Sequence, residues 1–176
     1  MIIVYWSARN VQHYLNPGNH HFVLVTGNSE LCMEYNIAPR THNGMTFFTL
    51  AAFKDDAGNM VFGPNDSFDV RSVRERLDNP GWYAPEPNWD FQGHEVNSPN
   101  GCSHLFAKRL LTLSANFDKN SQTTPIPFKS GDRNCATWVN TLFKVAGVPY
   151  SERLTAGEFS GIDMGEEEYI PEKMFK

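Results

Sequence analysis

The 176-residue sequence contains only three cysteines, Cys32, Cys102 and Cys135. No two of them have the CxxC spacing, and none stands at zinc-finger spacing from a histidine. An odd number of cysteines in a chain without a signal peptide is typical of free thiols in a reducing compartment. The sequence therefore predicts neither a disulfide framework nor a structural zinc site, and it indicates no other metal or cofactor.

Long apolar runs are also absent. No stretch approaches the roughly 18 consecutive apolar residues that span a bilayer, so we expect no transmembrane segment. The first ten residues, MIIVYWSARN, lack the basic region and the long apolar region of a secretory signal. We therefore expect a cytoplasmic location, with signal-independent export as an effector as the alternative.

The sequence has no excess of positive charge, since its formal net charge is −5. This balance argues against nucleic acid or an anionic membrane surface as the main partner. The length favours a single domain over residues 1–176. Hydrophobic residues make up 40% of the chain, as in ordinary globular proteins, and the 13% of aromatic residues is a rich share.

The first third of the chain reads as β-strands joined by turns. Short runs rich in β-branched and aromatic residues are bounded by turn signals such as TGNS and KDDAG. The fold class predicted is α+β, with an antiparallel sheet of about four or five strands packed against helices. The expected strands are residues 1–10, 21–27, 30–37, 44–53 and 59–63.

Helical periodicity appears later in the chain. Residues 67–79 predict a helix capped by Asp66 or Ser67, and residues 102–117 predict a second one with Leu105 on its apolar face. Residues 80–101, rich in proline and tryptophan, predict a long loop without regular structure. Residues 151–176 form an acidic tail with no strong periodicity.

A third helix is predicted from Asn134 to Gly147. Its apolar stripe begins at Cys135, and either Asp132 or Asn134 can cap its N-terminus. A thiol in the first turn lies at the positive end of the helix dipole, which favours the thiolate and lowers the pKa of the thiol. Cys135 is therefore either a nucleophile or a small buried core residue.

A thiolate nucleophile needs a base, and the run HHFVLVTG over residues 20–27 begins with two histidines, His20 and His21. Successive residues of a strand point to opposite faces of the sheet, so one imidazole lies on each face. A second pairing, Cys102 with His104, is weaker because residues two apart on a helix do not share a face.

The histidine strand and the cysteine helix together show a resemblance to a known family. His21 opens a mostly apolar run that closes at Gly27, and Asn134 and Cys135 open an apolar helix. This order resembles the circularly permuted NlpC-type branch of the papain-like fold, to which lecithin–retinol acyltransferase-like proteins also belong. His20 stands one residue too early for the motif.

The resemblance implies a papain-like fold with the cysteine at the N-terminus of a C-terminal helix. It implies Cys135 as nucleophile, His21 as base and a third polar residue on the next strand. Glu34 is the candidate for that third residue, with Asn36 as the alternative and His42 as a more distant one.

The resemblance also implies a cysteine hydrolase that cleaves an amide bond through a thioester, with cell-wall peptides as one substrate class. Hydrolysis of acyl esters, acyl transfer, and a non-catalytic binding or immunity-like module on the same scaffold are the alternatives. Trp82 and Trp89 in the long loop, with Tyr83 and Phe91, predict an aromatic wall for a peptide or acyl substrate. Local packing of the loop around its prolines is the other interpretation of this cluster.

Overall fold

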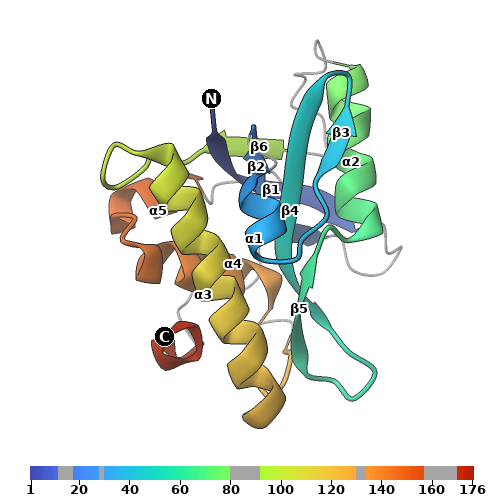
Figure 1. The fold of residues 1–176 in the computed structure, drawn as a ribbon. Coiled ribbons are helices and arrows are strands. Elements are labelled where there is room, and N and C mark those ends of the chain that lie inside the picture. The colour runs from blue at the N-terminus through green and yellow to red at the C-terminus, as the bar shows by residue number, and fades with distance from the viewer. Residues whose placement is uncertain (12–17, 28–29, 80–91, 130–133, 157–169) are drawn as a thin grey trace.

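A computed structural model of the protein describes residues 1–11, 18–27, 30–79, 92–129, 134–156 and 170–176. Its centre is an antiparallel sheet in which six strands are described (Figure 1). The spatial order is β3-β4-β2-β1-β6, and β5 pairs with β4 off this path. The strands are β1 (Ile3–Val11), β2 (Gly18–Thr26), β3 (Arg40–His42), β4 (Met45–Lys54), β5 (Met60–Pro64) and β6 (Gln92–Glu95).

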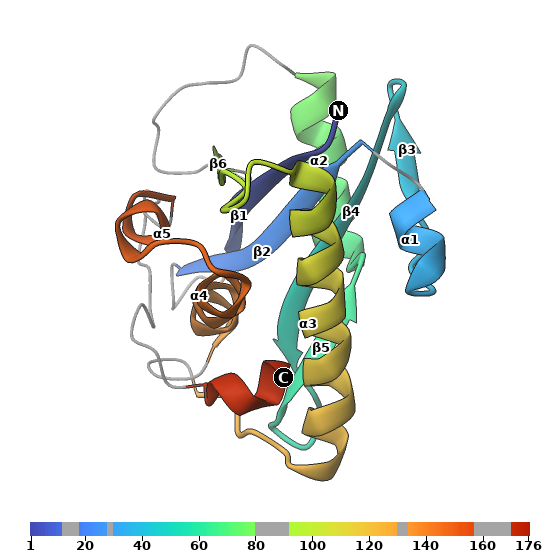
Figure 2. The same ribbon diagram turned by 60° about the vertical axis from the view of Figure 1, so that its left-hand side comes forward.

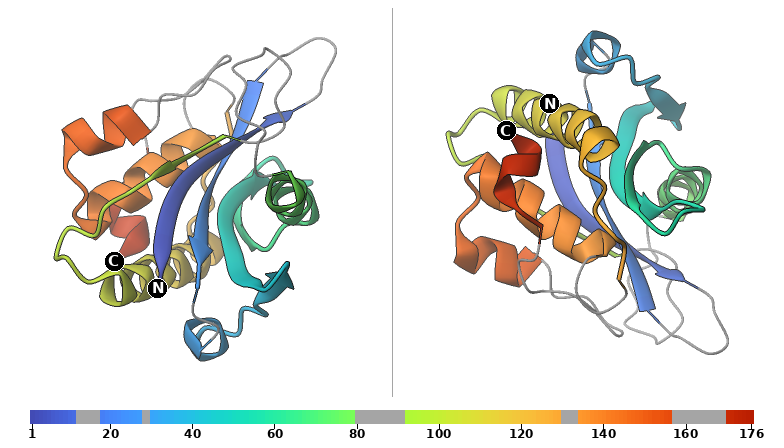
Figure 3. Two further views of the ribbon diagram at one scale, coloured as in Figure 1. Left: turned by 90° about the horizontal axis from the view of Figure 1, so that it is seen from above. Right: turned by 90° about the horizontal axis from the view of Figure 1, so that it is seen from below.

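Helices cover both faces of this sheet, as the rotated views show (Figures 2 and 3). One helix, α2, lies on one face, while α3, α4 and the C-terminal 3-10 helix η1 lie on the other. None of the helices in the described part of the chain is long and apolar enough to cross a membrane. The helices are α1 (Glu30–Glu34), α2 (Ser67–Asp78), α3 (Ser103–Thr123), α4 (Cys135–Ala146), α5 (Tyr150–Ala156) and η1 (Glu172–Phe175).

The alternation of side chains along β2 divides the interior into two hydrophobic clusters. Val23 and Val25 belong to the larger cluster, which includes the buried faces of α3 and α4. Phe22 and Leu24 point the other way and pack with residues of α2. A central strand with apolar residues on both faces is what a sheet covered on both sides requires.

The strand β4 pairs with β2 over only part of its length. Its residues 47–50 pair with Val23–Thr26 of β2, whereas its residues 50–54 pair with β5. β1, in contrast, pairs with β2 over the whole of Gly18–Thr26. The first half of β2 therefore has a strand neighbour on the β1 side and no β4 neighbour on the other, and this geometry positions the site described below.

The expected α+β class, with an antiparallel sheet packed against helices, is confirmed. The predicted helix over 67–79 is α2, and Asp66 is its N-cap, since its side chain accepts from the backbone N–H groups of Phe68 and Asp69. The helix predicted over 102–117 is α3, which continues to Thr123. Leu105 is 59% exposed, so its predicted place on the buried face is wrong.

The strand expected over residues 30–37 is wrong. Residues Glu30–Glu34 form the short helix α1, and the chain then turns at Asn36, which has φ +55°. Glutamate, leucine and methionine are good helix formers, and this local preference prevails over the apparent alternation of apolar residues. The alternation also fails on burial, because Leu31 is buried while Met33 is 71% exposed.

Two segments expected to be irregular contain regular elements. Residues 92–95, inside the predicted loop over 80–101, form β6 and pair with β1, because an antiparallel partner satisfies their backbone groups. In the predicted tail over 151–176, residues 151–156 belong to α5 and residues 172–175 form η1. Met174 and Phe175 are buried in the larger cluster, so burial of apolar side chains holds this part of the chain against α3.

One glycine makes room for an aromatic ring at the edge of the sheet. A Cβ atom at Gly63 of β5 would lie 2.7 Å from Cδ2 of Phe53 on β4, closer than atoms of this kind approach one another. The ring of Phe53 therefore lies directly over the backbone of Gly63. Phe53 also packs on the cluster beneath α2. The absence of a Cβ atom at Gly63 leaves the space that the ring needs in this position.

Trp138 of α4 is the side chain whose removal would test the larger cluster. It is fully buried and its ring centroid lies 5.8–5.9 Å from those of Phe62, Phe117 and Phe175. We expect Trp138→Ala to lower the free energy of unfolding by about 3–5 kcal/mol, because it leaves a large cavity. The melting temperature should fall by about 6–20 °C.

Leu105→Ala on α3 is the matched control, because Leu105 is mostly exposed. Its free energy of unfolding should change by less than about 0.5 kcal/mol. Urea denaturation of both variants measures the difference. Equal stability losses in the two variants would contradict the packing described here.

Candidate active site

Cys135 is the first residue of α4 and lies at the end of that helix nearest to β2. Asn134 is the N-cap, and its side chain accepts from the backbone N–H of Thr137, whose hydroxyl in turn accepts from the backbone N–H of Asn134. A reciprocal cap of this kind fixes the first turn and contributes about 1 kcal/mol. Cys135 is only 7% exposed.

The sulfur of Cys135 faces the half of β2 that β4 does not cover. The backbone N–H of His21 donates to Cys135 Sγ, with a nitrogen–sulfur distance of 3.4 Å. A strand N–H on this side would ordinarily donate to a neighbouring strand, but β4 pairs with β2 only from Val23 onward. The sulfur therefore accepts a hydrogen bond that the backbone of a neighbouring strand would otherwise accept. This hydrogen bond from His21 favours the thiolate form of Cys135.

The imidazole that pairs with this thiol belongs to His20. The charge and hydrogen-bonding capacity of each side chain shift the pKa of the other in the direction of a thiolate–imidazolium pair. The ring of His20 is stacked on that of Phe53, with centroids 4.7 Å apart and an interplanar angle of 22°. Because His20 is only 7% exposed, the ring is held in one place and is largely shielded from water.

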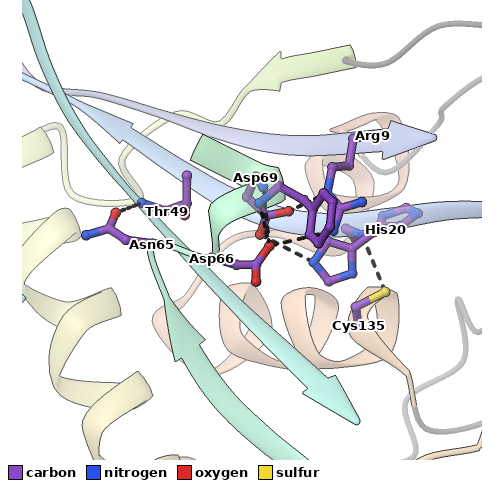
Figure 4. Close-up of polar contacts among 9 residues, drawn as sticks. Arg9, His20, Thr49, Asn65, Asp66, Asp69 and Cys135 are labelled. Atoms are coloured by element: carbon purple, nitrogen blue, oxygen red, sulfur yellow. Dashed lines mark hydrogen bonds and ion pairs between the residues drawn. The ribbon is translucent and has the colours of Figure 1, made fainter. Parts of the chain in front are cut away.

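A carboxylate lies on the far side of the imidazole (Figure 4). Asp69 stands in the first turn of α2, is fully buried, and places Oδ2 at 3.4 Å from His20 Nε2. These two atoms form an ion pair whose angle lies outside hydrogen-bond geometry.

Asp69 has a second cationic partner. The Nε of Arg9 donates to Asp69 Oδ1 at 2.6 Å. Arg9 lies on β1 directly opposite His20 in the β1–β2 register, so both side chains are on the α2 face of the sheet. The four groups of Cys135, His20, Asp69 and Arg9 thus form one continuous chain of polar contacts from α4 to β1.

These interactions lower the pKa of the Cys135 thiol and raise the pKa of the His20 imidazole, so each side chain favours the charged form of the other. Burial raises the pKa of Cys135, but the charge and hydrogen bond of His20, with smaller contributions from His21, lower it to about 7. Burial lowers the pKa of His20, but the Cys135 thiolate and the Asp69 carboxylate raise it to about 9. A thiolate–imidazolium pair therefore prevails between about pH 7 and pH 9.

The predicted base, His21, contacts Cys135 through its backbone N–H. Its ring also contacts Trp6. Nδ1 of His21 accepts a hydrogen bond from Nε1 of Trp6 at 3.0 Å, and the two rings meet edge to face on the side of the larger cluster. Of the two histidines, His20 rather than the predicted His21 therefore has the larger effect on the pKa of Cys135. The reason is that the even-numbered residue of this pair points to the face on which α2 places Asp69.

The predicted orienting residues lie elsewhere because residues 30–34 are helical. Glu34 forms an exposed ion pair with Lys108 of α3, 2.8 Å between Oε1 and Nζ. Asn36 lies in the turn after α1. His42 pairs with Asp78 at 2.7 Å near the other end of α2. Asp69 is the carboxylate that faces the imidazole of His20.

The alternative nucleophile, Cys102, is the N-cap of α3 and is partly exposed, and His104 is exposed on the following turn. The aromatic residues predicted to contact a substrate, Trp82 and Trp89, lie outside the described residues. Within the described residues, no group of three or more histidine, cysteine or acidic side chains could hold a metal ion.

Sequence reasoning missed His20 and Asp69 as a pair. The signal for His20 was the doubled histidine itself, which places an imidazole on each face of the strand. Asp69 resembled an ordinary acidic residue of a first helical turn, where the helix dipole favours negative charge. Comparisons with protein-family models, with curated proteins and with solved structures found no match to this chain.

The arrangement predicts how fast Cys135 alkylates as a function of pH. The rate should reach half of its maximum near pH 7, because the thiolate is the reactive form. His20→Gln should move this midpoint upward to about 8.5 or higher. Burial raises the pKa of Cys135, and the variant lacks the imidazolium charge that lowers it. Iodoacetamide labelling at a series of pH values, followed by peptide mass mapping, gives the midpoint.

His42→Gln is the control, because that histidine pairs with Asp78 and takes no part in the contacts of Cys135. Its midpoint should equal that of the unaltered protein. Because the midpoint rather than the absolute rate is compared, the limited exposure of Cys135 does not affect the result. A midpoint that stays near pH 7 in His20→Gln would refute the assignment of His20.

Proposed function

We propose that the protein is a cysteine hydrolase that cleaves an amide bond through a thioester on Cys135. His20 is the base in this proposal, and Asp69 orients its ring. The observation that carries the proposal is the buried series of thiol, imidazole and carboxylate, in which Nε2 of the imidazole faces Asp69 and the thiol and the imidazole shift each other's pKa. Nucleophilic catalysis by cysteine uses this arrangement of groups.

The proposed reaction has two halves. In the first, the thiolate of Cys135 attacks the carbonyl carbon of the amide, and the positive end of α4 stabilises the oxyanion that forms. The C–N bond then breaks as the His20 imidazolium gives its proton to the leaving amine, leaving a thioester. In the second half, neutral His20 takes a proton from water, the water attacks the thioester, and the acid and the thiolate are released.

The proposal includes a papain-like scaffold of the circularly permuted NlpC type. Three features support it: the antiparallel sheet, the histidine strand that precedes the cysteine helix along the chain, and the position of Cys135 in the first turn of α4. Two features depart from the expected pattern. The imidazole comes from His20, one residue before the motif position, and the carboxylate comes from helix α2 rather than from the next strand.

Peptide amides, including those of bacterial cell-wall peptides, are the substrates that we propose first. A thiolate–imidazolium pair also cleaves acyl esters and transfers acyl groups, because both reactions pass through the same thioester. The exposed Phe68 in the first turn of α2 lies beside Arg9 and Asp69, and it offers an apolar contact to a substrate near the site.

We expect the unaltered protein to become acetylated on Cys135 by p-nitrophenyl acetate and then to release acetate. Intact-mass analysis and nitrophenolate release measure the two steps. Cys135→Ser should give no rapid acylation, because an alcohol lacks the lowered pKa of this thiol. His20→Gln should slow acylation by about 10²-fold or more, as loss of a general base does.

His21→Gln is the matched control, because it changes the neighbouring histidine and keeps an acceptor for Trp6. Its backbone N–H still reaches Cys135, so acylation should fall by far less than in His20→Gln. The same variants are then assayed on cell-wall peptides for release of amines. Equal acylation of the unaltered protein and Cys135→Ser would mean that the chain is a binding module and not a hydrolase.

A further inference from the structure

The Asp69 carboxylate is shared between two cations. Its Oδ1 receives the hydrogen bond from Arg9 at 2.6 Å, and its Oδ2 faces His20 at 3.4 Å. The shorter contact goes to the residue that has no place in the proposed chemistry. A fully buried carboxylate with one oxygen fixed in this way cannot rotate to place both oxygens on the imidazole.

Arg9 is itself held from several sides. Its side chain is 14% exposed, and its NH2 group lies 3.8 Å from Oδ1 of Asp66, the N-cap of α2. Its guanidinium carbon lies 5.4 Å from the ring centroid of Phe68, which covers it from the solvent side. The first turn of α2 thus fixes both the carboxylate and the cation that binds it.

We propose that Arg9 is a positioning residue of this site, which holds Asp69 by one oxygen and limits the negative charge that Asp69 presents to His20. This inference rests on the proposed function. An imidazolium facing an uncompensated buried carboxylate would hold its proton more tightly. The reaction requires His20 to release that proton to the leaving amine, and only the neutral ring that results can then take a proton from water.

Charged and titratable groups face His20 from every element that packs on it. Cys135 approaches from α4, Asp69 from α2 and Arg9 from β1, with Asp66 behind Arg9, and His21 is the neighbour of His20 on β2. Phe53 of β4 contributes an uncharged ring. Of these groups Arg9 is the permanent cation. Its loss removes a positive charge near His20 and so favours the protonated imidazole.

The test is an NMR titration of the His20 ring in the full chain. Arg9→Gln should move the His20 midpoint upward by about one pH unit, because a nearby positive charge is removed. Arg9→Lys should return it close to the unaltered value. Asp66→Asn, which keeps a good N-cap and removes a neighbouring anion, should leave the midpoint unchanged or slightly lower. If the role of Arg9 were purely structural, the His20 midpoint would not rise in Arg9→Gln and return in Arg9→Lys.

A midpoint in Arg9→Gln that is unchanged or lower overturns the inference. If Arg9→Gln does not fold, Phe68→Ala replaces it, because Phe68 is 61% exposed and its loss frees the guanidinium without removing a charge. That variant should raise the midpoint by a smaller amount, and no rise overturns the inference. Cys135→Ala tests the proposed function separately: if it does not lower the His20 midpoint, the thiol and the imidazole are not a pair, whatever the Arg9 variants show.

Discussion

The rest of the site depends on the separation of β4 from β2 after Leu50. Up to that residue, one edge of β4 pairs with β2, and beyond it β4 continues along β5, which pairs with its other edge. The backbone of β2 at His20 and His21 then faces the end of a helix rather than another strand. A buried N–H there needs an acceptor, and the sulfur of Cys135 provides one. The end of the β2–β4 pairing therefore leaves room for a helix terminus against the middle of the sheet.

The same opening lets polar groups connect the two faces of the sheet. α4 packs on one face and α2 on the other, yet Cys135 of α4 and Asp69 of α2 both reach the imidazole of His20. A single buried charge at any of these positions would be costly. Four groups of alternating charge compensate one another, and the compensation explains why the pKa values of the thiol and the imidazole move in opposite directions.

The sequence predicts the elements of this arrangement better than it predicts their contacts. The apolar stripe after Cys135 and the cap at Asn134 define α4, because helical period and capping are local properties. The choice between His20 and His21 is not local. Strand alternation places one imidazole on each face, but only the position of α2 decides which face carries a carboxylate. At residues 30–37 the error was local: the helical preference of these residues outweighed the apparent alternation. Glu34 therefore lies on a helix and not on the strand that was expected to carry it to the site.

Gly63 links the β4–β5 hairpin to the polarity of the imidazole. The ring of Phe53 lies over this glycine on one side and stacks on His20 on the other. A single added methyl group would push the ring from its place, and water would gain access to one face of the histidine. The proton affinity of His20 is thus sensitive to a backbone position that contacts neither the thiol nor the carboxylate. Natural sequence variation at this hairpin would consequently tune the acidity of the site while every polar group in it stayed the same.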